Sequence, residues 1–165
     1  AHDVARVSRG LGAARLDMIQ ERHELIKLWA HESLRTFADR LRSDDERQDL
    51  DELLGEIIQA NFRAQWRPSL EAGPLRYGDV LRMSAEGRCY EQLQDEQRLG
   101  KALSDYLSDY NVHVGSSTPP LRVVFFEDAI DHVLRILRVS QLPYGHMLLV
   151  GTPGCGGRSL CTLAA

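Results

Sequence analysis

Apolar side chains recur along much of the chain at the spacing of helix faces. Between residues 20 and 42 the spacings are 4, 4, 3 and 4, through Ile26, Ala30, Leu34, Phe37 and Leu41. A stripe of this period predicts one long amphipathic helix. Trp29 lies beside the stripe and widens the apolar face, so this helix is expected to bury much of its surface.

Start and stop signals bound two further helices. A short helix is predicted from Asp3 to Gly10, with Gly10 and Gly12 loosening its end. Residues 43–46 (SDDE) form a capping box, because a hydroxyl at the N-cap and a carboxylate three residues later satisfy each other's backbone N–H groups. The helix that this box opens is expected to face inward at Leu50, Leu53, Leu54, Ile57 and Ile58.

The middle of the chain is broken by Pro68, Gly73, Pro74 and Gly78, which predict loops or short irregular pieces. Helix is predicted again between about Tyr90 and Tyr110, where one stripe holds Leu99, Leu103, Tyr106, Leu107 and Tyr110. Up to this point the chain is expected to be mainly α.

The pattern changes at residues 115–120 (GSSTPP), a polar, proline-ended stretch that predicts a boundary between residues 1–115 and 116–165. Beyond it, residues 121–126 are expected to be extended, and a helix follows with Ala129, Ile130, Val133, Leu134 and Leu137 on its buried side. Residues 147–150 (MLLV) are too short for a helix and predict a central strand of a parallel sheet. The last segment therefore predicts the opening of an α/β unit.

Composition narrows the function classes only a little. Apolar residues make up 43% and charged residues 27%, which is ordinary for a globular protein. A net charge of -4 favours neither nucleic acid nor an anionic membrane as partner. No apolar run approaches the ~20 residues that cross a bilayer. Three scattered cysteines predict no disulfide framework and favour a reducing compartment, and both ends are expected to be cuts within a longer protein.

The strongest chemical signal follows the predicted strand, at residues 151–159 (GTPGCGGRS). In the phosphate-binding P-loop, G-x-x-x-x-G-K-[ST], glycines let the backbone N–H groups curl around phosphate oxygens, and the next helix adds the positive end of its dipole. Gly151 and Gly156 match the fixed glycines. The residues predicted to bind a nucleotide are Gly151, Thr152, Pro153, Gly154, Cys155, Gly156, Gly157, Arg158 and Ser159.

Two positions of that pattern fail. Gly157 stands where lysine reaches the β- and γ-phosphates, and Arg158 stands where a hydroxyl holds magnesium. Arg158 could swing toward a phosphate, and Ser159 could act as a displaced hydroxyl. The alternative is a strand–turn–helix corner whose glycines serve only packing.

Other candidate chemistry is weaker. Residues 31–35 (HESLR) begin like a zinc-protease helix, but Arg35 replaces the second histidine, so solvated residues or a structural ion pair are expected and no metal site is predicted. Cys155 near a helix N-terminus lacks a base partner and is interpreted as a small loop residue. The aromatic residues are interpreted as core or interface: Trp29, Trp66, Tyr106 and Tyr110.

Several strings together resemble the dynein heavy chain, whose motor ring has six AAA+ modules. Residues 28–41 (LWAHESLRTFADRL) are similar to the lid helix of its third module, and residues 75–80 (LRYGDV) and 110–111 (YN) resemble later parts of that lid. Residues 126–138 and 143–151 look like the entry to the fourth module and its first strand. The ending of the loop, Arg158, Ser159 and Leu160, is similar to the axonemal form.

Two positions depart from the family. The axonemal loop has arginine at the lysine position, whereas this chain has Gly157 and shifts the arginine to Arg158. Near the start, the family carries an arginine that resembles the AAA+ sensor-two residue, and His2 stands in its place here. Arg6 lies one helical turn later and could substitute for it.

The resemblance implies a helical AAA+ lid at 1–115, followed at 116–165 by the opening strand, P-loop and helix of the next module. It implies a role in coupling ATP-driven changes between modules to movement on microtubules, with ATP or ADP and magnesium at a degenerate site. The segment alone is expected not to hydrolyse ATP, because the acidic strand and the arginine finger are absent. Coiled coil is expected elsewhere in the heavy chain.

The implied partners are the rest of the heavy chain, other dynein subunits and microtubules, with no nucleic acid or membrane. The implied place is the cytoplasm and cytoskeleton, in the axoneme of a cilium or flagellum. Two other hypotheses for the function of the chain stay open. One is a helical interaction or scaffold domain with a structural glycine corner, and the other is a truncated P-loop NTPase of another family.

Overall fold

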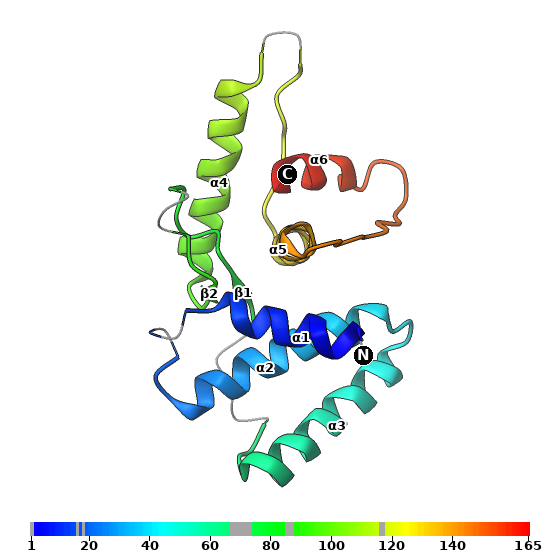
Figure 1. The fold of residues 1–165 in the computed structure, drawn as a ribbon. Coiled ribbons are helices and arrows are strands. Elements are labelled where there is room, and N and C mark those ends of the chain that lie inside the picture. Colours follow the sequence, from blue (N-terminus) through cyan, green and yellow to red (C-terminus); the bar gives the residue numbers. More distant parts are fainter. Residues whose placement is uncertain (1, 16, 18, 67–73, 85–87, 116–117) are drawn as a thin grey trace. The chain divides into compact units, whose positions relative to one another are not determined.

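The fold is mainly α, as the sequence predicts. The computed structural model describes residues 2–15, 17, 19–66, 74–84, 88–115 and 118–165. The helices are α1 (His2–Ala13), α2 (Arg22–Phe37), η2 (Ala38–Arg40, a 3-10 turn), α3 (Asp44–Phe62), α4 (Glu96–His113), α5 (Glu127–Gln141) and α6 (Gly157–Ala164). A two-stranded sheet pairs β1 (Tyr77–Gly78) with β2 (Glu91–Gln92) (Figure 1).

The chain divides into two compact units. One contains Ala1–Tyr77 and Tyr90–Gln94, and the other contains Gly78–Cys89 and Asp95–Ala165. The predicted boundary between residues 1–115 and 116–165 divides the chain differently from these two units, and it stays a prediction. None of the helices among the described residues is long and apolar enough to cross a membrane.

In the first unit, α2 is buried on several sides rather than along one stripe. Ile26 and Ala30 of the predicted stripe lie in a core cluster with Ile58 and Trp66. Phe37, predicted to face inward, is 37% exposed, because the helix ends there and η2 turns the chain away. A second buried face of α2 carries Leu28, His31, Glu32, Ser33 and Thr36.

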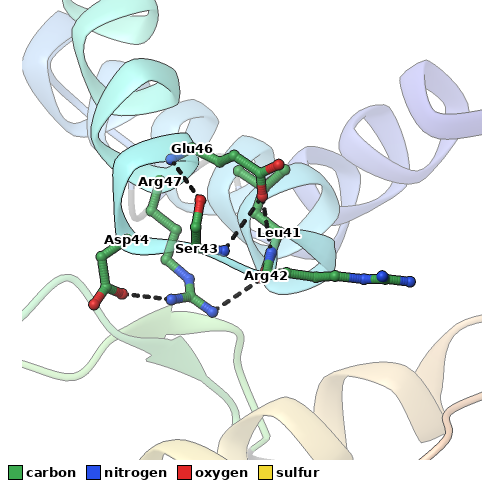
Figure 2. Close-up of polar contacts among 6 residues, drawn as sticks. All are labelled: Leu41, Arg42, Ser43, Asp44, Glu46 and Arg47. Atoms are coloured by element: carbon green, nitrogen blue, oxygen red, sulfur yellow. Dashed lines mark hydrogen bonds and ion pairs between the residues drawn. The ribbon is translucent and has the colours of Figure 1, made fainter.

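The capping box at the start of α3 is confirmed. The Ser43 hydroxyl accepts the Glu46 N–H at 3.2 Å, and the Glu46 carboxylate accepts the N–H groups of Arg42 and Ser43 at 3.0 and 3.3 Å (Figure 2). Leu54 and Ile58 face inward as predicted. Leu53 does not, since it is 50% exposed on the far side of a helix that buries only a narrow face.

We expect this cap to make the first unit sensitive to acid. The two backbone N–H bonds hold the pKa of Glu46 below its ordinary value. A carboxyl with a depressed folded-state pKa stabilises the fold above its unfolded pKa, and this stabilisation is lost as pH falls through the folded pKa. Urea unfolding between neutral and acidic pH should therefore show a loss of stability below the ordinary glutamate range, and Glu46→Gln should shrink that loss. An equal pH dependence in the variant would contradict the assignment.

The second unit places α4, α5 and α6 largely as predicted. Leu99 and Leu103 of α4 are almost fully buried, and the predicted face of α5 is confirmed except that Leu137 is half-buried. Helix α4 begins at Glu96 rather than near Tyr90, because Tyr90 takes part in a β-bridge with Ala14 and the Asp95 side chain then caps the helix by accepting the Arg98 N–H.

The predicted central strand at residues 147–150 is not formed. The segment is irregular, with Leu148 86% and Val150 82% exposed. A strand needs a neighbour to satisfy its backbone N–H and C=O groups, and no described segment pairs with this one. Residues 121–126 form neither helix nor strand, and their extended conformation stays a prediction. The apolar run that predicts a buried strand is therefore an exposed apolar segment in this chain.

Candidate functional site

The glycine loop leads directly into a helix, as the P-loop pattern requires. Gly154 and Gly156 both have positive φ, 87° and 83°, a backbone conformation that favours glycine. Gly156 is the N-cap of α6, and the Cys155 N–H donates to the Thr152 carbonyl at 3.2 Å. A Cβ on Gly151 would lie 2.7 Å from the Cys155 sulfur, so the loop is curled closely on itself.

A cavity of about 480 Å³ lies against the loop, within the range of small-molecule sites. The loop side of the lining includes most of the predicted nucleotide-binding residues: Gly151, Thr152, Gly154, Cys155, Gly156, Gly157 and Ser159. Pro153 and Arg158 do not line it, and Arg158 is exposed. The opposite side comes from residues 122–126 and the first turns of α5.

The backbone of the loop suits phosphate oxygens better than its side chains do. Its positive-φ glycines and the N-terminus of α6 offer the N–H groups of a phosphate cradle. Gly157 supplies no cation, and half-buried Ser159 is the hydroxyl of α6 that reaches the cavity lining. The residues therefore fit a phosphate cradle without the lysine that normally reaches the terminal phosphates.

The sequence does not predict the far wall of the cavity. Arg122, Phe126 and His132 all line it, and Arg122 is the one lysine or arginine among the described residues that do. His132 donates its Nδ1–H to the Asp128 carbonyl at 2.6 Å. The helical period of α5 places Asp128 and His132 on one face, but nothing in the sequence indicates where the irregular segment carrying Arg122 runs.

Residues 31–35 are buried structure rather than solvated surface. Arg35 forms the expected ion pair, 3.2 Å from Asp39. His31 and Glu32, however, are 6% and 0% exposed, because α2 is covered on this side. The Nδ1 of His31 donates to the Leu75 carbonyl at 3.0 Å, and the Tyr90 hydroxyl donates to Glu32 Oε1 at 2.5 Å.

The remaining candidates occupy ordinary structural positions. Trp66 is buried in the core and donates its ring N–H to Asp51 at 2.8 Å, and Trp29 packs near Phe62. The hydroxyl of Tyr106 donates to the Arg82 carbonyl at 2.8 Å. Among the residues that the structure describes, no group of histidine, cysteine and acidic side chains is arranged to hold a metal ion.

Comparisons with known proteins match both ends of the chain. Residues 1–47 match a family described as "Dynein heavy chain, ATPase lid domain", and residues 121–165 match "P-loop containing dynein motor region D4". Dynein axonemal heavy chain 1 of Mus musculus is 32% identical over 163 residues, and dynein axonemal heavy chain 10 of Homo sapiens is 32% identical over 165. Each alignment covers 99% of this chain and 4% of the relative, so the chain spans a small part of those proteins.

Proposed function

Because this chain belongs to the dynein heavy chain family, as a segment of its motor ring, we propose that it couples two successive AAA+ modules. Residues 1–115 serve as the lid of the third module, and residues 116–165 open the fourth. ATP-driven shifts of the lid pass along the chain to the next module and contribute to movement on microtubules.

The observation that carries this proposal is the order of elements in the second unit. Helix α4, the predicted end of the lid, packs within the same compact unit as α5, the glycine loop and α6. A displacement of α4 therefore acts on a body that includes the loop. The partners are the rest of the heavy chain, other dynein subunits and, through the whole motor, microtubules. The place of action is the axoneme of a cilium or flagellum, as the names of the relatives support.

The cavity at the loop takes ATP or ADP with magnesium, held mainly by backbone N–H groups. Bound nucleotide would supply phosphate charge that orders the loop and α6. The chain's own residues provide the curled glycines, the helix N-terminus and Ser159. Without lysine at position 157, binding is weak, and the role is regulatory rather than hydrolytic.

Restoring the missing cation tests the nucleotide proposal. Gly157→Lys should raise ATP binding at this loop about tenfold, because the lysine ammonium adds a charge-assisted bond to phosphate that glycine cannot make. The backbone tolerates a side chain there, since φ is not positive and the nearest atom to a new Cβ is the movable Leu149 Cδ2, at 3.0 Å. Photolabelling of an intact motor with an azido-ATP analogue, followed by mapping of the labelled peptide, separates this loop from other nucleotide sites.

The matched control is Gly157→Ala, which adds the Cβ contact with Leu149 but no charge. It should leave labelling unchanged or slightly weaker. If Gly157→Lys labels the loop no better than Gly157→Ala, the glycines form a structural corner and the nucleotide proposal fails.

A further inference from the structure

One side chain near the end of α4 holds the segment that forms the far wall of the cavity. The Asn111 Nδ2 donates to the Leu121 carbonyl at 3.0 Å, and the Leu121 N–H donates to the Asn111 Oδ1 at 2.8 Å. Both groups are half-buried. An amide that bonds both polar groups of one residue imitates a strand pair, so it fixes the position and the direction of the backbone at Leu121.

The bonded residue is adjacent to the cavity. Leu121 directly precedes Arg122, and the lining continues through Val123, Val124 and Phe126 to the first turn of α5. Residues 118–126, called the return segment here, run back to the start of α5 (Figure 1). Asn111 therefore fixes the end of this return segment from which Arg122 projects.

We propose that Asn111 is a positioning residue through which α4 controls the nucleotide cavity. It holds Leu121 so that Arg122 faces the glycine loop, where the guanidinium supplies the positive charge that Gly157 lacks. The ligand class is a phosphorylated nucleotide, and this part of the inference rests on the function proposed above. When α4 moves, the pair with Leu121 carries the cavity wall with it.

Only a side chain with a donor and an acceptor at this distance from the helix can make the pair. Aspartate keeps the shape and the acceptor of Asn111, but it turns an oxygen toward the Leu121 carbonyl in place of the donor. Alanine removes both bonds. The two variants therefore separate loss of contact from repulsion at the same site.

Hydrogen exchange in an intact motor, without any nucleotide, tests whether the two bonds between Asn111 and Leu121 hold the cavity wall. In Asn111→Ala, exchange at residues 121–126 should rise about tenfold, because the Leu121 N–H loses its acceptor and the wall loosens. Exchange at residues 149–157, across the cavity, should also rise. The matched control is Asn61→Ala, which removes an exposed bond from Asn61 Nδ2 to the Ile57 carbonyl at 2.8 Å in the other unit. Asn61→Ala should change neither segment.

Azido-ATP labelling of the loop then tests the ligand. Asn111→Ala and Asn111→Asp should each weaken labelling about fivefold, with the aspartate variant at least as weak as the alanine variant. If Asn111 acts through Arg122, the double variant with Arg122→Gln should be no weaker than Arg122→Gln alone, because effects that share one path do not add.

The outcomes separate the two proposals. If the unaltered motor is not labelled at residues 151–159, the nucleotide function is overturned. The hydrogen-exchange experiment still decides whether Asn111 positions the cavity wall. The positioning role of Asn111 is overturned if exchange at residues 149–157 is unchanged in Asn111→Ala, or if Asn61→Ala has the same effect. Full additivity with Arg122→Gln overturns the route through Arg122.

Discussion

Replacing Gly10 by alanine should destabilise the first unit by about 2 kcal/mol, although alanine is the better helix former by about 1 kcal/mol. Gly10 is buried inside α1, directly over the carboxylate of Glu32. A Cβ there would lie 1.8 Å from Glu32 Oε2 and 2.0 Å from its Cδ. Glu32 is fully buried and accepts the Tyr90 hydroxyl, so its carboxylate cannot move aside without weakening that bond or lifting α1.

The chain supplies a matched control two residues away. Gly12 also lies in α1, but a Cβ on it would meet no atom within 4 Å. Gly12→Ala should therefore stabilise the same unit by about 1 kcal/mol, through helix propensity alone. Urea unfolding followed by tryptophan fluorescence measures both, because Trp29 and Trp66 both lie in the first unit. The predicted close packing is contradicted if the two alanine variants shift the midpoint in the same direction.

These glycines also show what the hydrophobic pattern can and cannot predict. From the sequence, Gly10 and Gly12 loosen the end of a short helix, whereas α1 continues through both to Ala13. Propensity is a weak local preference, and packing of α1 against α2 overrides it. The need for glycine at position 10 depends on a carboxylate that lies far along the chain, and no local signal reports it.

Features that depend on residues close together in the sequence are predicted well. The Ser43 cap, the start of α6 after Gly156, and the buried face of α5 all follow from neighbours a few residues apart. Strand pairing is different, because residues 147–150 need backbone partners that no local pattern supplies. The same limit applies to the site. The spacing of the glycines predicts the loop, whereas the roles of Arg122 and Asn111 at the cavity depend on the path of residues 118–126, which no local pattern predicts.

The buried string at residues 28–32 explains why so much of the first unit depends on one face of α2. Leu28 packs in a cluster with Tyr77 and Tyr90, and His31 lies 5.1 Å from the Tyr77 ring. Burial raises the pKa of the Tyr77 phenol, so that it stays neutral in the cluster. Glu32 completes this face through Tyr90, the residue that also bridges to Ala14. Side chains from distant parts of the chain therefore meet on a single helix turn.

Removing the fully buried Glu32 carboxylate should strongly destabilise the first unit. Glu32→Ala should cost about 3 kcal/mol, because it opens a cavity and takes the acceptor from a buried hydroxyl. Tyr90→Phe removes only the donor of that 2.5 Å bond and should cost about 2 kcal/mol. Tryptophan fluorescence during urea unfolding measures each loss.

A double-mutant cycle decides whether the two residues act as one contact. If the Tyr90 bond carries the interaction, the double variant should be less unstable than the sum of the single losses by about 1.5 kcal/mol. Glu32→Gln serves as the matched control, since its amide oxygen keeps an acceptor of nearly the same shape, and it should lose less than Glu32→Ala. Strict additivity would show instead that Glu32 stabilises the unit through its other contacts, with α1 held on α2 by shape rather than by this hydrogen bond.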